Sequence, residues 1–204
     1  NGASAVMLKA DEVQGRVGTA SAFINREGTA KPSSNVIAPK PAPKLRFVAP
    51  NPKAVSSDNK KFGMRSSQLA TMMKSTIKDT DSDCPNLSDK SPWRINRLNG
   101  SQLLVQHECW RGAYNVGTGV WVMNDSKPYN PVLVTTSATG YDEGKITSVQ
   151  RGRGIGDCLA KSEWIWTGKS FSKSHESTTG LCRLIEAGGA WDLPTYVTEV
   201  RAVQ

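Results

Sequence analysis

The chain has 204 residues, a hydrophobic fraction of 37% and a formal net charge of +8. This length allows one good-sized domain and a smaller piece, and the hydrophobic fraction supplies a packed core only if part of the chain lies outside it. No run approaches the roughly 18 apolar residues that a membrane-spanning helix needs, so we predict no membrane span.

The positive charge is concentrated in one stretch. Residues 29–62 hold seven basic residues and one acidic residue, whereas residues 63–204 hold 16 basic and 14 acidic residues and are nearly neutral. Because aromatic residues do not alternate with these charges, apart from Phe47, the pattern argues against a nucleic-acid partner. We interpret the stretch as a solvated tether, and the alternative is a contact with anionic lipid or polymer.

Residues 1–28 predict a helix followed by a short strand. Val6, Val13 and Val17 recur at helical spacing, Gly18 is a plausible helix stop, and SAFINREG has the pattern of a strand that enters a turn. Since a helix and one strand cannot bury a core alone, we expect this part to be the tail of an upstream domain.

Residues 29–62 are predicted to be a Pro- and Lys-rich linker. Six of the eleven prolines fall between residues 29 and 53, a density that forbids helix or central strand and favours extended chain. Within the linker, the segment KLRFVAP can pair as an edge strand.

Residues 63–204 are predicted to form the main, β-rich domain. A helix begins at Ser66 or Ser67 in SSQLATMMKSTIKD and places Leu69, Met73 and Ile77 on one face. Seven or eight antiparallel strands follow, with hairpins predicted at Asn99-Gly100 and in SEWIWTGKSFSKSHES. The other predicted strands lie in GVWVMND, PVLVTTSAT, KITSVQRG and, as one final strand, WDLPTYVTEVRAV.

The four cysteines are spread through this domain without a CxxC pair. This pattern is typical of two disulfides in an oxidising compartment. Four cysteines allow three connectivities, and we favour Cys84–Cys109 and Cys158–Cys182, because each pair brackets a local supersecondary unit. A zinc site is disfavoured because close cysteine pairs are missing, and buried free thiols are the other alternative.

No motif indicates an enzyme. His107 and Cys109 point the same way on a strand, but a disulfide at Cys109 removes the thiolate that a cysteine nucleophile needs. The glycine-rich run from Gly152 to Gly156 lacks the following helix of a dinucleotide fingerprint and the Lys-Ser/Thr of a phosphate loop. It is interpreted as a tight turn, with an anion-binding backbone nest beside Arg151 and Arg153 as the alternative. We predict no cofactor.

Two further groups of residues are candidate sites. Asp79, Asp81 and Asp83 match the first, third and fifth positions of a calcium loop, but Cys84 and Lys90 stand where that loop needs Gly and Glu, so we predict a solvated acidic turn and no metal. All six tryptophans fall in or beside strands, where core packing is the rule. The alternative is a stacking platform for sugar or peptide on an exposed Trp164/Trp166 face.

The segments CWRGAYN (109–115), GRGIGDC (152–158), EWIWTGKSF (163–171), DEVQGR (11–16) and GGAWDLPTYVTEV (188–200) resemble the bacterial family called domain of unknown function 1176. The resemblance extends over nearly the whole chain apart from the linker. It implies a secreted or periplasmic protein with a further N-terminal region, and it implies no catalytic residues.

The sequence therefore predicts an α+β protein, mainly antiparallel β-sheet with one packed helix and two disulfides, preceded by a Pro-rich linker. Its expected function is that of a non-catalytic periplasmic or secreted binding or interaction module, whose partner is an envelope protein or a glycan. The candidate ligand-binding residues are Arg111, Tyr114, Arg151, Arg153, Trp164 and Trp166. One alternative is a cell-wall hydrolase with Asp157 and Glu163 about 5–10 Å apart, and another is an inhibitor of a secreted enzyme.

Overall fold

A computed structural model describes residues 2–19, 22–23, 41–50 and 66–203, and the chain divides into two compact units, Asn1–Pro41 and Ala42–Gln204. In the first unit, helix α1 (Gly2–Val13) ends four residues before the predicted position, because Gly15 turns the chain at φ 60°. The buried Asp11 carboxylate accepts the backbone N–H of Phe23 at 2.8 and 3.0 Å and so fixes the return of the chain. The strand predicted in SAFINREG lies outside the described residues apart from residues 22–23.

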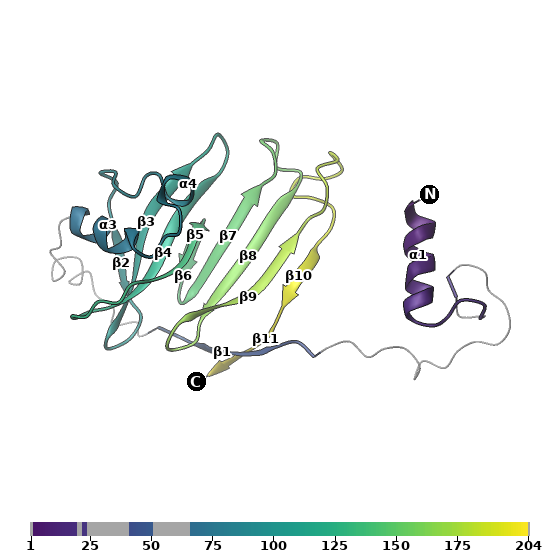
Figure 1. The fold of residues 1–204 in the computed structure, drawn as a ribbon, viewed down its shortest axis with the longest axis horizontal. Coiled ribbons are helices and arrows are strands. Elements are labelled where there is room, and N and C mark those ends of the chain that lie inside the picture. Colours follow the sequence, from purple (N-terminus) through teal and green to yellow (C-terminus); the bar gives the residue numbers. More distant parts are fainter. Residues whose placement is uncertain (1, 20–21, 24–40, 51–65, 204) are drawn as a thin grey trace. The chain divides into compact units, whose positions relative to one another are not determined.

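The second unit holds two antiparallel sheets and one parallel pair of strands (Figure 1). The four-stranded sheet has the order β2-β3-β4-β5, and the five-stranded sheet has the order β10-β9-β8-β7-β6. The strands of the first sheet are β2 (Arg94–Arg97), β3 (Gln102–Arg111), β4 (Val116–Asn124) and β5 (Val132–Ala138). Those of the second sheet are β6 (Gly140–Asp142), β7 (Lys145–Arg151), β8 (Leu159–Trp166), β9 (Phe171–Thr178) and β10 (Leu193–Val197).

Helix α3 (Ser66–Lys74) covers one face of the four-stranded sheet, as its apolar spacing predicted. Leu69 and Met73 pack against Trp121 and its neighbours, and all of these side chains are buried. At the end of the helix, the Thr76 hydroxyl accepts the Trp121 indole N–H at 2.9 Å, which fixes the helix over the sheet.

The opposite face of the same sheet packs against the five-stranded sheet. Leu104 and Val120 lie in a second buried cluster together with Ile146 and Trp166. The chain passes from one sheet to the other between β5 and β6. Near this crossing, the hydroxyl of Ser148 on β7 donates to the carbonyl of Ser137 on β5 at 2.7 Å. Each sheet therefore supplies one wall of a shared core.

Both predicted disulfides are present. Cys84–Cys109 joins the chain just after the short helix α4 (Thr80–Asp83) to β3, and Cys158–Cys182 joins the chain before β8 to the segment that follows β9. The mainly antiparallel α+β fold is likewise confirmed. Among the described residues, no helix is long and apolar enough to span a bilayer.

The strand count differs from the prediction. Residues 66–203 form ten strands, β2 to β11, rather than seven or eight, and the single final strand predicted from the sequence is two, β10 and β11 (Glu199–Val203). The break falls at Thr198, whose hydroxyl donates to the Ser174 carbonyl at 2.9 Å before the chain leaves the sheet. Beyond it, β11 pairs in parallel with β1 (Lys44–Val48).

Strand β1 falls within the segment KLRFVAP, where an edge strand was expected, and it joins the sheet-bearing unit. Apart from residues 41–50, the stretch predicted as a linker lies outside the described residues. The division into an upstream tail, a linker and a main domain therefore stays a prediction.

Candidate functional site

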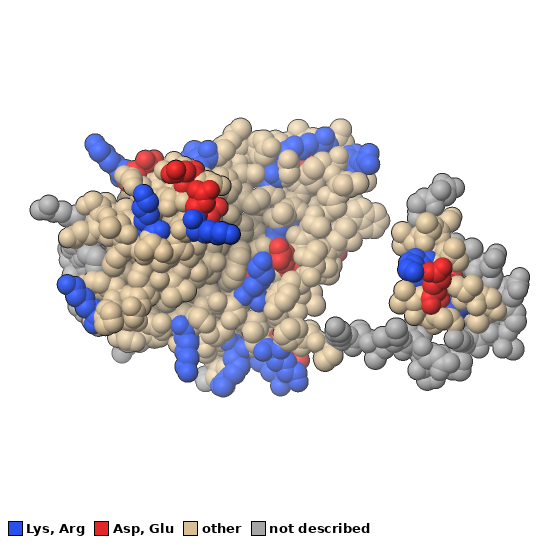
Figure 2. Space-filling view, viewed as in Figure 1, with Lys and Arg blue, Asp and Glu red and all other residues tan. Residues whose placement is uncertain are grey.

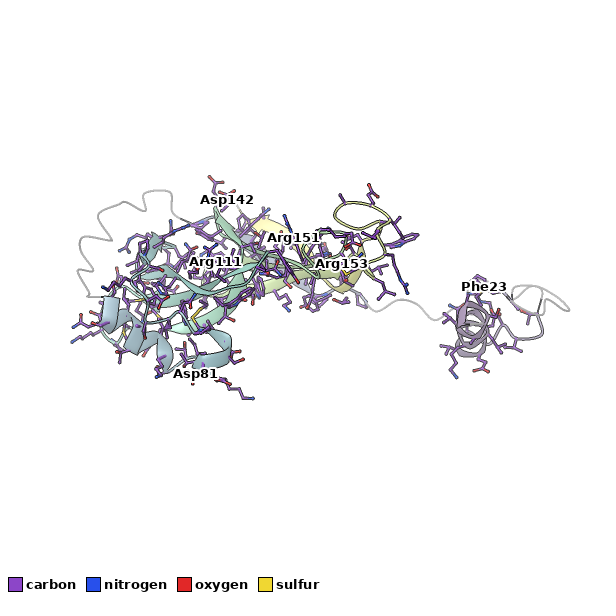
Figure 3. The ribbon with its side chains drawn as sticks, turned by 90° about the horizontal axis from the view of Figure 1, so that it is seen from above. Phe23, Asp81, Arg111, Asp142, Arg151 and Arg153 are labelled. Atoms are coloured by element: carbon purple, nitrogen blue, oxygen red, sulfur yellow. A yellow bond between two sulfur atoms is a disulfide. The ribbon has the colours of Figure 1, made fainter. Side chains whose placement is uncertain are left out.

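Four of the six predicted ligand-binding residues come together at one end of the sheets. Arg111 ends β3, Tyr114 follows it in the turn to β4, Arg151 ends β7, and Arg153 lies in the loop after β7. Figure 3 shows the three arginines in succession across the middle of the view, away from Asp81. We call this region, with the loop 151–157 and the segment 181–193, the disulfide end.

Side-chain contacts hold the turn before β4 against the loop after β7. The Asn115 side chain accepts the backbone N–H of Arg151 and donates to its carbonyl, both at 2.9 Å. A Cβ at Gly154 would lie 3.6 Å from the Tyr114 ring, so the aromatic ring rests on the glycine-rich loop. The two connections therefore form one surface rather than two separate loops.

Arg153 and Asp157 form the strongest polar contact of this end. The Arg153 guanidinium donates to both carboxylate oxygens of Asp157, at 2.8 and 2.5 Å, and the carboxylate also accepts the Leu184 backbone N–H at 2.7 Å. Asp157 is 5% exposed. The hydrogen bonds from Arg153, and after them the one from Leu184, hold the pKa of Asp157 well below its usual range.

This ion pair changes the interpretation of Arg153. From the sequence we expected the Arg153 charge to be available to a ligand. In the structure, Arg153 instead binds Asp157, and Asp157 in turn holds segment 181–193 through the Leu184 N–H. The backbone nest is also partly occupied, because the N–H groups of Gly152 and Gly156 donate to the carbonyls of Cys158 and Arg153.

The other two arginines differ in how they are held. Arg111 donates to both carboxylate oxygens of Glu108, at 2.6 and 3.0 Å. Arg151 extends its side chain over Gly156 and is exposed.

The sequence reasoning missed the most unusual feature of this end, which is a group of large apolar side chains in solvent. Six of them are between 47% and 73% exposed, namely Ile155, Leu181, Leu184, Ile185, Trp191 and Leu193. Their segment is tied to loop 151–157 by the second disulfide and by the hydrogen bond from Gly188 N–H to the Gly156 carbonyl at 2.8 Å. The available signal was the run LCRLI, in which Leu181, Leu184 and Ile185 have helical spacing although the structure forms no helix there.

Basic side chains accompany this apolar group. Arg151 and Arg183 are exposed, and Arg153 is 41% exposed. Figure 2 shows basic side chains gathered over the loops that join β7 to β8 and β9 to β10. Glu186 and Asp192 are exposed in the same segment, so the surface combines apolar groups with charges of both signs.

The two tryptophans proposed as a platform lie away from this end. Leu159 of β8 pairs with Arg151, whereas Ile165 pairs with Lys145 at the other end of β7, so Trp164 and Trp166 lie toward the opposite edge. Trp166 is 1% exposed and belongs to the second core cluster, which removes it from the candidate site.

Trp164 is half-buried, and the Lys173 ammonium lies 5.6 Å above its ring. It borders a cleft of about 240 Å³ between β4, β5, β8 and β9. Because Lys173 covers the ring and itself donates to Glu176 at 2.8 Å, the ring is not an open stacking platform.

The other motifs have structural roles. Cys109 is in a disulfide and therefore offers no thiolate. His107 is buried and stacked on Trp93 at 4.3 Å, with Nε2 3.0 Å from the Asn86 carbonyl. Burial lowers the pKa of His107, so the ring is neutral at pH 7.

The acidic turn does not form a calcium loop. Asp79 caps α4 by accepting the Ser82 N–H at 3.3 Å, and Asp81 and Asp83 lie within that helix. Within the described residues, the ligand atoms of one trio, Asp157, Cys158 and Cys182, meet closely enough for a metal. Both of these cysteines are disulfide-bonded, which leaves one carboxylate there.

The carboxylates of the hydrolase alternative do not face each other. Asp157 precedes β8 and is held by Arg153, whereas Glu163 lies within β8 and accepts the Ser174 hydroxyl at 2.6 Å. The four residue-to-residue steps of extended strand from Leu159 to Glu163 alone span about 13 Å, more than the separation that a pair of glycosidase carboxylates needs.

The fold and this end define a disulfide-bonded, mainly antiparallel α+β protein with an exposed surface of apolar and charged side chains. The chain belongs to the family described as protein of unknown function (DUF1176), whose model matches residues 1–198. No curated protein and no solved structure matches the chain.

Proposed function

We propose that the chain is a non-catalytic periplasmic or secreted module that binds a partner protein through the disulfide end. The observation that carries this proposal is the exposed apolar group. If each of its six side chains exposes on the order of 100 Å², together they expose on the order of 600 Å², which is most of the roughly 800 Å² that one partner contributes to a standard interface. Continuous apolar patches larger than a few hundred Å² mark interaction surfaces on soluble proteins.

The compartment follows from the cysteines. All four are paired, and no free cysteine is found. Structural disulfides form and persist in oxidising compartments and are rare in the cytosol. This supports a non-cytoplasmic protein, and the periplasm or the exterior is the finer assignment that we propose.

The kind of partner is inferred from the polarity and charge of the exposed side chains. The centre of the patch is apolar, and Arg151 and Arg183 are exposed near it. Because Glu186 and Asp192 are exposed there too, a protein with an apolar surface and charges of both signs at its edge complements this arrangement. A secreted enzyme held by this surface is one such partner, so an inhibitor role remains a form of the same proposal.

Paired substitutions test the proposal. The chain carrying Leu184→Asp and Ile185→Asp is compared with Val132→Asp in affinity capture from native envelope extract, followed by a binding assay with the purified partner. Val132 is 61% exposed on β5 and is the matched control. We expect the double variant to bind about a hundredfold more weakly, since two charges are placed in an apolar interface, and the control to bind as wild type. Equal binding by both variants would contradict the proposal.

A further inference from the structure

A polar pocket lies on the sheet face that carries the second core cluster, apart from the disulfide end. Its volume is about 240 Å³. Strands β2, β3 and β4 supply one side, and the corner between β5 and β6 supplies the other. The lining residues are Arg94, Asn96, Gln106, Thr118, Ala138, Thr139, Gly140 and Tyr141.

The strand register explains why polar groups meet here. Leu104 and Val120 of this face are buried in the core, and Gln106 and Thr118 are the next residues on the same face. Arg94 stands opposite Gln106 in the β2–β3 ladder. The pocket therefore begins where the apolar core ends, and the lining changes from apolar to polar side chains.

The polar groups of the pocket are oriented by contacts with each other, and they keep hydrogen-bonding capacity and charge for a ligand. Gln106 is 8% exposed, and its amide nitrogen donates to the Asn96 side-chain oxygen at 3.0 Å, which orients both amides. Arg94 is exposed, and no ion pair forms at its guanidinium within the described residues. None of the lining residues is Asp or Glu, so the pocket has a positive charge that its own walls do not neutralise.

We propose that this pocket binds a small hydroxylated carboxylate, of the chemical class of the sugar acids. The Arg94 guanidinium matches a carboxylate through two parallel hydrogen bonds. The Asn96 and Gln106 amides and the Thr118 hydroxyl match ligand hydroxyl groups. The small volume and polar lining favour such a ligand over an extended apolar one. This inference stands independently of the partner-binding surface.

The test is an NMR titration of the whole chain with D-glucuronate, D-glucose and acetate as probes. We expect glucuronate to shift the backbone amide signals of Gln106 and Thr118, and the two comparison probes to bind about tenfold more weakly or worse. Arg94→Ala should lower glucuronate affinity about tenfold or more, because the guanidinium supplies the charge-assisted bonds. Arg201→Ala, an exposed arginine on β11, is the matched control and should leave the affinity unchanged.

Three outcomes would overturn the inference. These are the absence of shifts at both amides with millimolar glucuronate, equal affinity for glucose, and unchanged affinity in Arg94→Ala. Because Arg94 is exposed, its variant should keep the wild-type melting temperature, which separates lost binding from lost folding. A negative result here leaves the disulfide end untouched, since none of the pocket residues belongs to it.

Discussion

At Asp157, a single carboxylate links the two parts of the disulfide end, loop 151–157 and segment 181–193. It accepts hydrogen bonds from Arg153 and from the backbone of Leu184, in the segment that the second disulfide also anchors. The sequence showed an arginine and an aspartate four residues apart in a glycine-rich loop. It did not show that the aspartate is buried, and so it did not show that Arg153 holds the loop together.

The low pKa of Asp157 predicts a loss of stability in acid. A carboxyl group whose pKa is lower in the folded than in the unfolded chain stabilises the fold above the unfolded value of about 3.9. That contribution disappears as pH falls through the lower, folded value. Asp157→Asn should therefore lose less stability than wild type between pH 5 and pH 2, as measured by urea unfolding across a pH series.

Asp192→Asn is the control for this experiment. Asp192 is an exposed carboxyl group of the same end, and its replacement should leave the wild-type dependence on pH in place. If the Asp157→Asn and wild-type curves ran parallel throughout, the assigned role of the carboxylate would be wrong.

Gly119 shows how closely β4 approaches the first disulfide. A Cβ at this position would collide with the Trp121 ring and would lie 2.5 Å from the Cys109 sulfur. We expect Gly119→Ala to destabilise the fold by about 1–3 kcal/mol through overpacking. Gly100→Ala, where nothing lies within 4 Å, should change stability by less than about 0.5 kcal/mol. Thermal unfolding compares the two, and equal melting temperatures would refute this packing.

At the scale of elements, the local units were predictable from the sequence. Helix α3 follows from its apolar spacing, and the β2–β3 hairpin from Asn99-Gly100. The disulfides were predictable because each closes a local loop, with sequence separations of 25 and 24 residues.

Long-range pairing and burial depth were not predictable. The parallel pairing of β1 with β11 joins Lys44 to Glu199, and no local pattern encodes such a contact. Alternation places Trp164 and Trp166 on one face of β8, but it does not tell how deeply each is covered. Only the opposing sheet decides that Trp166 is core and Trp164 is half-buried.

The second disulfide should act mainly on one segment. Replacing Cys158 and Cys182 together by Ser removes a loop closure that stabilises the fold by about 3 kcal/mol. We expect faster hydrogen exchange in residues 181–191, while α3 and β3, tied by Cys84–Cys109, keep their relative protection. Exchange mass spectrometry distinguishes this from a uniform acceleration over both sheets, which would show that the second disulfide does not act locally.

At the scale of the whole molecule, the side chains that stabilise the sheet-bearing unit are not those of the binding surface that we propose. Two apolar clusters, one under α3 and one between the sheets, bury the large side chains that hold the fold together. The disulfide end adds exposed apolar and charged side chains that belong to neither cluster. Since a disulfide and the Arg153–Asp157 ion pair hold this end in shape, the binding surface that we propose is preorganised.

The most direct test of this account is site-specific photocrosslinking in the native envelope. A photoreactive residue replaces Ile185, which is 67% exposed at the disulfide end, or Val132, which is 61% exposed on β5. We predict that the residue at 185 crosslinks to one defined protein, that Leu184→Asp abolishes this product, and that position 132 does not form it. The same product from both positions, or none from position 185, would contradict the assignment of the disulfide end as the binding surface.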